Sequence, residues 1–377
     1  MRVVFAPDSF KGSIPAREAA EALAAGWTSV RPDDDAVLRP MADGGEGTRA
    51  AFSAAIEGTQ QRATDVVGPD GASHPAPWLM LPGRTAFIEL ASASGIELLG
   101  ECRLPFDAHT LGFGQAIAAA IADGATRILL GIGSSASTDA GTGMLRALGA
   151  RFLDADGGDV ALGLRGLADL ASVDLNGLIP LPPRGVLVLS DVDNPLLGPR
   201  GAAHVFGPQK GLDERGVELA DLMLARFAAL LGADPDRPGA GAAGGTGYAL
   251  QFWGAELGTG ATEVARIVGL PDALDGADLV VTGEGKFDVS SAHGKVPASV
   301  ADLASSAGVP AALVAGAVAK DADASAFATV LSLTSLAGSA AAAMSDAARW
   351  LRAAGQRLAH DAGGQQPGPA GREAAAG

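Results

Sequence analysis

The stretch at residues 127–148, RILLGIGSSASTDAGTGMLRAL, constrains the fold more than any other part of the chain. It begins as an apolar run typical of a buried strand and ends with the apolar spacing of a helix, for which Asp139 is the expected N-cap residue. A strand that leads through a loop of glycines and hydroxyls into a helix N-terminus offers unpaired N–H groups and a positive dipole end to an anion. The stretch therefore predicts an α/β fold and one wall of a phosphate-transfer site, to which we assign Gly133, Ser134, Ser135 and Asp139.

Length and charge exclude several classes of protein. The 377 residues are long for a single core, so two domains are expected. The net charge of −16, without any Lys/Arg cluster, argues against a nucleic-acid partner, and Cys102 as the single cysteine excludes a disulfide and a Cys-based zinc site. No uncharged apolar run reaches the roughly 18 residues of a membrane span. The N-terminal MRVVFAP is typical of a first strand rather than a signal peptide, so we expect a cytoplasmic protein with no membrane partner.

Predicted strands and helices alternate along most of the chain, which is typical of an α/β fold. Between residues 60 and 90 the pattern changes to β segments separated by the turns GPDG and PGR, and this change indicates passage into a second domain. Near the C-terminus we predict one long helix over residues 337–358, followed by a low-complexity, disordered tail at 361–377. Among the predicted strands are 3–6, 37–40, 128–132, 185–189, 279–282, 311–315 and 329–333.

Acidic residues recur in glycine-containing loops at the ends of four of these strands: Asp8, Asp43, Asp191, and Glu284 with Asp288. Each close pair of carboxylates costs on the order of 1 kcal/mol or more outside bulk water, so a chain gathers them where a cation or a proton transfer uses them. Three loops of this kind also carry lysines: Lys11, Lys210 and Lys295. Together these groups predict Mg²⁺-assisted phosphoryl transfer to a small hydroxylated acceptor.

Further candidate binding residues stand beside these acids and lysines. The loop MADGGEGT surrounds its carboxylates with glycines, which let backbone approach a ligand closely. The loop PDSFKGS fits a solvated turn as well as it fits a ligand-binding loop. These further candidates are Ser9, Gly44, Gly45, Glu46, Asn194 and Lys286.

Seven blocks, in this order, resemble those of the bacterial type-one glycerate kinase family: APDSFKGS, MADGGEGT, IELASASG, GIGSSASTDAGTGML, DVDNPLLGPRGAAHVFGPQKG, PGAGAAGG and TGEGKFDVSSAHGKVP. Members of that family phosphorylate D-glycerate with ATP, generally at the 2-position. The resemblance therefore implies ATP and Mg²⁺ as cofactors, D-glycerate as substrate and 2-phosphoglycerate rather than 3-phosphoglycerate as product, and it allows a homo-oligomer.

The resemblance also implies a domain arrangement and residue roles. A Rossmann-like domain is expected from residues 1–60 and 275–360, with a flavodoxin-like domain inserted at 61–274 and the active site between them. Asp191 is the favoured base, Lys11 and Asp43 act with it, and Asp191, Glu284 and Asp288 are the expected metal ligands. The implied members on the terminal domain are Asp8, Lys11, Asp43, Glu284 and Asp288, and those on the insert are Asp139, Asp191, Asn194 and Lys210.

The chain departs from the family pattern in the loop after the strand at 128–132. Ser134, Thr138 and Ala140 stand where the family often has Gly, Asn and Gly, and Lys286 stands where it often has Arg. A side chain at Ser134 limits how closely backbone approaches a ligand.

A nicotinamide-dependent oxidoreductase acting on a small hydroxy acid is the alternative hypothesis. GIGSSA at residues 131–136 follows a strand and precedes a helix, and Asp154 or Asp156 follows the next strand as a ribose-binding acid would. This alternative leaves the acidic loops at Asp43, Asp191 and Glu284 without a role.

Overall fold

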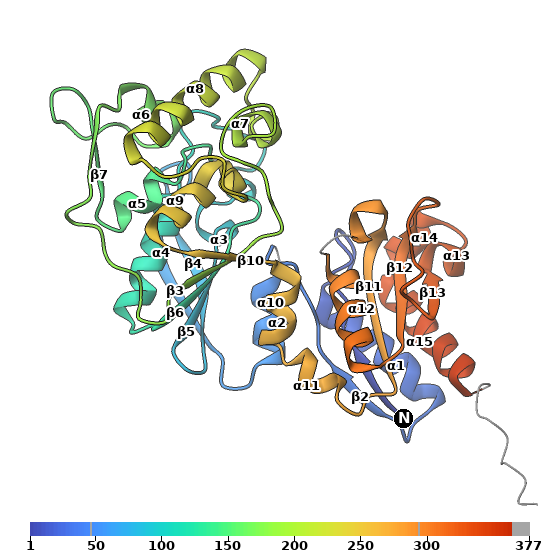
Figure 1. Ribbon diagram of the computed structural model, residues 1–377. Helices are drawn as coiled ribbons and strands as arrows, with labels where there is room; N and C mark the ends of the chain where they lie inside the picture. Colours follow the sequence, from blue (N-terminus) through green and yellow to red (C-terminus); the bar gives the residue numbers. More distant parts are fainter. Residues whose placement is uncertain (46, 293–294, 364–377) are drawn as a thin grey trace, which may run out of the picture. The chain divides into compact units, whose positions relative to one another are not determined.

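The computed structural model of the protein describes residues 1–45, 47–292 and 295–363. The chain forms two compact units, each with its own sheet (Figure 1), and the predicted α/β class is confirmed. The terminal unit combines Met1–Met41 with the chain from Gly269 onward, and the middle unit is Ala42–Val268. None of the helices in the described ranges is long and apolar enough to cross a membrane.

The bounds of the two units differ from the predicted domain bounds at 60/61 and 274/275. The segment before residue 60 belongs to the middle unit because α2 (Thr48–Ala55) packs on its sheet. The ring of Phe52 in α2 meets that of Phe87 edge to face, with the ring centroids 4.8 Å apart. Asp43, expected on the terminal domain, therefore lies in the middle unit.

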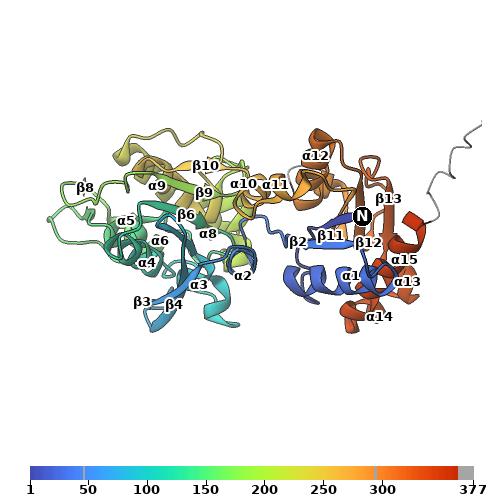
Figure 2. The same ribbon diagram turned by 90° about the horizontal axis from the view of Figure 1, so that it is seen from below.

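The terminal unit is built on a five-stranded parallel sheet in the order β13-β12-β11-β1-β2. Figure 2 shows α12 on one side of this sheet and α1, α14 and α15 on the other. Coverage of both faces explains why the central strands are continuous apolar runs such as VVF and LVV. The strands are β1 (Arg2–Phe5), β2 (Asp35–Leu38), β11 (Leu279–Phe287), β12 (Ala311–Val318) and β13 (Thr329–Ser332). The helices are α1 (Ala16–Val30), α11 (Leu270–Leu274), the 3-10 turn η4 (Val289–Ala292), α12 (Val296–Ala307), α13 (Leu333–Ala337), α14 (Ala340–Ser345) and α15 (Ala347–Gly363).

Two predictions for the terminal unit are wrong. β11 does not end at Thr282, because the following residues continue to pair with β12 and Glu284 lies opposite Ala315. The long helix predicted at 337–358 is instead the end of α13, α14 and most of α15. Gly338, with φ +82°, ends α13, and the Ser339 hydroxyl accepts the N–H of Ala342 to cap α14. Asp346, with φ −146° and ψ 60°, then separates α14 from α15. α15 continues to Gly363, and the rest of the predicted tail lies outside the described residues.

The middle unit has a six-stranded mixed sheet in the order β10-β9-β6-β5-β4-β3, in which β10, β9, β6 and β5 are parallel. Alternate residues of the buried strands face opposite sides: Ile88 and Leu130 enter the main core, whereas Phe87 faces α2. The strands are β3 (Gln60–Val67), β4 (Ser73–Leu81), β5 (Thr85–Glu89), β6 (Arg127–Gly131), β9 (Val186–Leu189) and β10 (Glu256–Gly258), with β7 (Arg151–Leu153) and β8 (Ser172–Asp174) as a separate hairpin-like pair. The remaining helices are α3 (Ala91–Ser94), η1 (Ile96–Leu99), α4 (Leu111–Ala122), α5 (Thr142–Ala147), α6 (Gly163–Asp169), α7 (Ala202–Phe206), η2 (Pro208–Lys210), α8 (Glu214–Leu231), η3 (Ala242–Gly245), α9 (Thr246–Trp253) and α10 (Gly260–Ile267).

The first and last helices of the terminal unit pack closely through glycine. A Cβ atom on Gly26 of α1 would lie 2.0 Å from the carbonyl oxygen of Arg352, and one on Gly355 of α15 would lie 2.2 Å from that of Leu23. Both distances are far inside van der Waals contact, so the two ends of the chain meet only because these positions lack a side chain.

We expect Gly355→Ala to lower the free energy of unfolding by about 1–3 kcal/mol, since the added methyl group forces α1 and α15 apart. Denaturant titration followed by circular dichroism measures this change. His360→Ala, at an exposed position of the same helix, is the control and should change it by less than about 0.5 kcal/mol. Equal stability of Gly355→Ala and the parent would contradict the close approach.

Candidate active site

Four strands of the middle sheet end together at one edge. β5, β6, β9 and β10 are parallel, and Glu89, Gly131, Leu189 and Gly258 end them in register. The loops that follow parallel strands emerge side by side, which is where open α/β sheets bind ligands. The loop after β6 is the predicted loop of glycines and hydroxyls, and the loop after β9 begins with Ser190.

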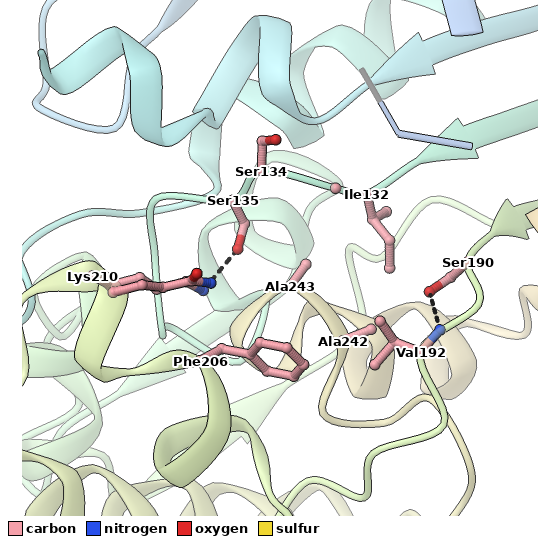
Figure 3. Close-up of a pocket in the computed structure, with 11 residues that line it drawn as sticks. Ile132, Ser134, Ser135, Ser190, Val192, Phe206, Lys210, Ala242 and Ala243 are labelled. Carbon is pink, nitrogen blue, oxygen red and sulfur yellow. Dashed lines mark hydrogen bonds between the residues drawn. The ribbon is translucent and has the colours of Figure 1, made fainter. Parts of the chain in front are cut away.

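A cavity of about 160 Å³ lies among these loops (Figure 3). One part of its wall carries hydroxyl, amide and ammonium groups, and the other part is apolar. The polar lining residues are Ser134, Ser135, Ser190, Gln209 and Lys210, and the others are Ile132, Gly133, Val192, Phe206, Ala242 and Ala243.

Lys210 brings a buried cation to the cavity. Its side chain is only 2% exposed, and Nζ donates to Ser135 Oγ at 2.7 Å and to the carbonyl oxygen of Ser137. Burial lowers the pKa of Lys210 to about 7, and the negative charge of Asp139 opposes that shift. Because both hydrogen-bond acceptors are neutral, an anion in the cavity would interact favourably with the ammonium group.

The backbone around the cavity also offers hydrogen-bond donors. The N–H groups of Gly133, Ser134 and Ser135 make no hydrogen bond to any residue within the described ranges. Ser134 has φ +58° and Ala243 has φ +52°, a conformation that side chains other than Asn and Asp rarely adopt. Successive N–H groups around a left-handed residue form a concavity that attracts anions.

Asp139 does not occupy the position predicted for it. The residue that precedes α5 is Gly141, with φ +73°, so Asp139 is not the N-cap residue. Its side chain is completely buried and accepts five hydrogen bonds, from Thr110 N (2.9 Å), Thr110 Oγ1 (2.8 Å), Ser137 Oγ (3.0 Å), Gly141 N (3.1 Å) and Gly143 N (3.2 Å). The carboxylate therefore organises the loop from inside, and it is not among the residues that line the cavity.

Asp43 and its following glycines cross the same edge of the sheet at very short range. A Cβ atom on Gly44 would lie 2.6 Å from that of Leu189, one on Gly131 would lie 2.5 Å from the Gly44 carbonyl oxygen, and one on Gly260 would lie 1.8 Å from the Asp43 carbonyl oxygen. The Asp43 carboxylate accepts the N–H of Gly45 at 2.9 Å. Glu46, predicted for the same loop, lies outside the described residues.

Asp191 is held beside this segment by the start of α10. Its Oδ1 accepts the N–H of Gly260 at 2.8 Å. Although the residue as a whole is exposed, desolvation of the carboxyl group raises its pKa to about 6; the Gly260 N–H opposes this shift, and the negative charge of Asp43 adds to it. A carboxylate with such a pKa is suited to accept a proton near neutral pH.

Asn194, a predicted binding residue, makes two hydrogen bonds within the chain. Its Nδ2 donates to the carbonyl oxygen of Arg200 at 2.7 Å, and its own carbonyl oxygen accepts the N–H of Gly241. It closes the loop after β9, and the cavity lining does not include it.

The remaining predicted residues lie in the terminal unit, where β1 and β11 are parallel neighbours. Asp8 follows β1, donates its N–H to the carbonyl oxygen of Gly283 at 2.8 Å, and accepts the N–H of Ser9 at 2.6 Å. Lys11 lies in the same exposed turn. Lys286, at the end of β11, pairs with Asp288 at 3.2 Å, and Lys295 precedes α12.

Glu284 is the buried acid of this group. It is 8% exposed, and its Oε1 has no hydrogen-bond partner in the described part of the chain. Burial raises the pKa of Glu284; the Ser291 hydroxyl and the charges of Lys295 and Lys11 lower it, while Asp288 raises it further. A buried carboxylate oxygen without a partner is the kind of atom that a cation or a ligand satisfies.

Sequence reasoning missed several residues around the cavity. Val192, Phe206 and Ala243 lie within the quoted blocks, but apolar residues in loops are common, and only the folded chain shows that these three share a cavity. Gly260 could have been suspected only as a glycine directly before a helical pattern. Ser190 and Gln209 could have been found from the sequence. Ser190 directly follows a predicted strand, and Gln209 directly precedes the candidate residue Lys210.

An α/β unit with a glycine- and serine-rich loop, a buried lysine and two neighbouring carboxylates at the strand ends defines an enzyme site for small anions. The chain belongs to the glycerate kinase family, whose model matches residues 3–362. It is therefore a kinase, a phosphotransferase that acts on an alcohol group.

Curated relatives and a solved structure agree with this family membership. Escherichia coli (strain K12) glycerate 2-kinase is 43% identical over 85% of this chain and 86% of its own length, and Bacillus subtilis (strain 168) glycerate kinase is 43% identical over 86% and 87%. The crystal structure of a protein from Salmonella typhimurium LT2, provisionally named glycerate kinase 2, matches 97% of this chain and 100% of its own with a TM-score of 0.86 and 38% identity.

The alternative of a nicotinamide-dependent oxidoreductase does not agree with the kinase family or with the topology. A dinucleotide motif places the strand after the helix beside the first strand of one parallel sheet. Here β7, which precedes Asp154, pairs with β8 in a two-stranded antiparallel sheet that is separate from the sheet of β6. Asp154 accepts the N–H groups of Asp156 and Gly158 within its own turn.

Ser134→Gly should stabilise the protein by about 0.5–1 kcal/mol. Left-handed φ costs an ordinary residue roughly 1–2 kcal/mol, and the extra freedom of glycine in the unfolded chain offsets about 0.4–1 kcal/mol of the gain. Thermal or denaturant unfolding measures the change. Ser134→Ala keeps Cβ and is the matched control, which should not be stabilised; equal effects of the two substitutions would contradict the strain at this residue.

Proposed function

We propose that the protein is a glycerate kinase that transfers the terminal phosphoryl group of ATP to D-glycerate, with Mg²⁺, and that 2-phosphoglycerate is the product. The observation that carries the proposal is the cavity beside β6 and β9, which is lined by Lys210 with its buried ammonium group, by Gly133 and by the hydroxyl-bearing Ser134, Ser135 and Ser190. A cavity of about 150 Å³ holds one benzene molecule, and a three-carbon hydroxy acid is of similar size. The names of the relatives from Escherichia coli and Bacillus subtilis support the same substrate.

In this proposal the middle unit binds glycerate and removes its proton. Lys210, Ser134, Ser135 and the N–H group of Gly133 bind the carboxylate or the transferred phosphoryl group. Asp191 accepts the proton of the attacking hydroxyl group, because its raised pKa matches that task and Asp43 lies close enough to influence it. Gly44 and Gly45 let Asp43 approach the strand ends, and Glu46 remains a predicted member of the loop.

The terminal unit would bind the charged part of the nucleotide. Lys11, Lys286 and Lys295 supply cations for phosphate oxygens. Asp8 and Ser9 directly precede the turn of Lys11, which hydrogen bonds between Phe10 and Ile14 close. Lys11 acts catalytically by neutralising charge that develops on the phosphoryl group. We propose the finer fold assignment as well, with a Rossmann-like terminal unit and a flavodoxin-like middle unit.

The carboxylates of the chain fit Mg²⁺ as part of a metal–nucleotide complex. Within the described ranges no three His, Cys, Asp or Glu residues gather as a metal site. Kinases commonly hold Mg²⁺ through one or two carboxylates, while phosphate oxygens and water complete the shell. Glu284, whose Oε1 has no hydrogen-bond partner among the described residues, fits this role with Asp288 of the same unit. Asp191 stays a predicted metal ligand. The ion would neutralise charge on the phosphoryl oxygens.

Phosphorus NMR of a mixture of the protein, ATP, Mg²⁺ and D-glycerate tests the proposal. We expect the ATP signals to be replaced by those of ADP and 2-phosphoglycerate, because the attacking hydroxyl group is the one nearest the bound carboxylate. A 3-phosphoglycerate signal would overturn the proposed position of transfer. No turnover of D-glycerate would overturn the substrate.

Asp191→Asn should lower kcat by about 10²–10⁴-fold, the usual contribution of a general base, and leave the fold intact. The fold is expected to persist because the carboxamide oxygen can still accept the N–H of Gly260. Steady-state kinetics and circular dichroism measure the two effects. Asp193→Asn is the matched control: Asp193 lies in the same loop, is 75% exposed and pairs with Arg200, so this variant should keep parent activity. Near-parent rates in Asp191→Asn would reject Asp191 as the base.

A further inference from the structure

We propose that Asp139 is a positioning residue for Lys210: it is the buried counter-charge and, through Ser137, the anchor that aims the Lys210 ammonium group at the cavity, without contact to substrate. The proposal rests on the proposed function only in that Lys210 is taken as the cation that binds the anionic group of the substrate.

The Asp139 carboxylate has no capacity left for a ligand. Its two oxygens have about four lone-pair sites and already accept five hydrogen bonds at 2.8–3.2 Å. Thr110 supplies two of them from the residue directly before α4. The carboxylate therefore ties the loop after β6 to a second element, which a solvent-exposed loop acid would not do.

Ser137 connects this carboxylate to the cavity. Its hydroxyl donates to Asp139 Oδ1 at 3.0 Å, and its carbonyl oxygen accepts from Lys210 Nζ. Gly244 packs directly over this contact: a Cβ atom there would lie 2.1 Å from the Ser137 carbonyl oxygen and 2.7 Å from Lys210 Nζ. Ser137 is thus held on one side by Asp139 and presents its carbonyl group to the ammonium group on the other. Loss of the Asp139 carboxylate would free the Ser137 hydroxyl and, with it, the carbonyl group that holds the Lys210 ammonium group.

Charge is the second link between Asp139 and Lys210. The hydrogen-bond acceptors of Lys210, Ser135 Oγ and the Ser137 carbonyl oxygen, are neutral, and the η3 turn AAGG that packs against it carries no titratable group. Asp139 is the charged residue that favours the protonated amine from within the described chain. Because a buried cation is costly without a nearby anion, the carboxylate keeps Lys210 protonated at a pH where burial alone would discharge it.

Two other bases face the same carboxylate. His109, which is buried and precedes Thr110, has its pKa lowered by burial and raised by Asp139. Arg146 of α5 also has its pKa lowered by burial and raised by the charges of Asp159 and Asp139. The charge of Asp139 thus acts on three bases: Lys210, His109 and Arg146. The amine of Lys210 is the one of these bases that lines the cavity.

The sign of the pH effect follows from this arrangement. Anion binding needs protonated Lys210, so affinity falls as pH rises through the pKa of Lys210. Asp139→Asn removes the charge that raises this pKa, and the fall in affinity should therefore move to lower pH by at least about one unit. At pH 7.5 the variant should bind an anion roughly tenfold more weakly than the parent, since one pKa unit corresponds to a factor of ten.

Binding of inorganic sulfate, measured calorimetrically on the full chain from pH 5.5 to 9, is the direct test, because sulfate keeps its charge across this range. The KM for glycerate is measured over the same range, with kcat determined separately at saturating substrate. We expect the midpoint to shift down by at least one unit in Asp139→Asn and the change to appear in KM more than in kcat. Asp154→Asn is the matched control, because it changes a carboxylate that organises a different turn into an amide. This variant should leave the pH profiles of sulfate binding and KM unchanged.

Parallel pH profiles in Asp139→Asn and the parent would overturn the proposal, because a purely structural carboxylate changes stability and not the midpoint. If Asp139→Asn does not fold, the double variant Asp139→Asn/Lys210→Met is the second test. A folded double variant supports Asp139 as the counter-charge of Lys210, and an unfolded one overturns the proposal. A parent enzyme that binds sulfate with the expected pH dependence but does not phosphorylate glycerate would reject the proposed function alone.

Discussion

The candidate active site depends on a carboxylate that never meets solvent. Asp139 gathers donors from the start of α4, from its own loop and from the start of α5, and these bonds set the path of the chain after β6. Buried polar networks strengthen when every member is satisfied and become costly when one is missing. The loop therefore has one arrangement of low energy, and the cavity inherits its shape from that arrangement. A ligand loop on the surface of an α/β sheet is usually mobile, whereas this one is fixed from within.

Close backbone contact provides the second constraint. The Asp43 segment can cross the strand ends only because Gly44, Gly131 and Gly260 carry no side chain at the crossing points. The same contacts place the Asp43 carboxylate near enough to Asp191 to raise its pKa. Two acids that repel each other are thus held near one another by steric fit. The repulsion raises the pKa of Asp191, which suits a carboxylate that must accept a proton near neutral pH.

Sequence patterns predicted the elements well where a continuous apolar run dominated, as in β6 and β9. The sequence patterns failed where a residue far away in the sequence determines the local structure. Thr110, 29 positions earlier, turns Asp139 from a helix cap into the centre of a network. Pairing with β12 keeps the glycine-rich end of β11 extended, and Asp346, whose backbone is not helical, separates α14 from α15 within the helix predicted at 337–358. Left-handed Ser134 and Ala243 have no local signal, because only the surrounding packing forces them into that conformation.

The cations of the chain show how an acidic protein can handle anions. Arginine supplies the cation in most ion pairs of the described residues, generally at the surface and beside an aspartate or glutamate. Of the five lysines in the sequence, four are candidate site residues: Lys11, Lys210, Lys286 and Lys295. The two residues are not equivalent, since the guanidinium group stays charged and suits planar pairs, whereas the ammonium group is compact and its pKa responds to burial. A site that binds one anion and releases another is served by a base whose pKa responds to its surroundings. The pKa of Lys210 responds in this way to burial and to the charge of Asp139. The overall charge of −16 then acts at long range, where salt screens it, while the lysines act at contact distance.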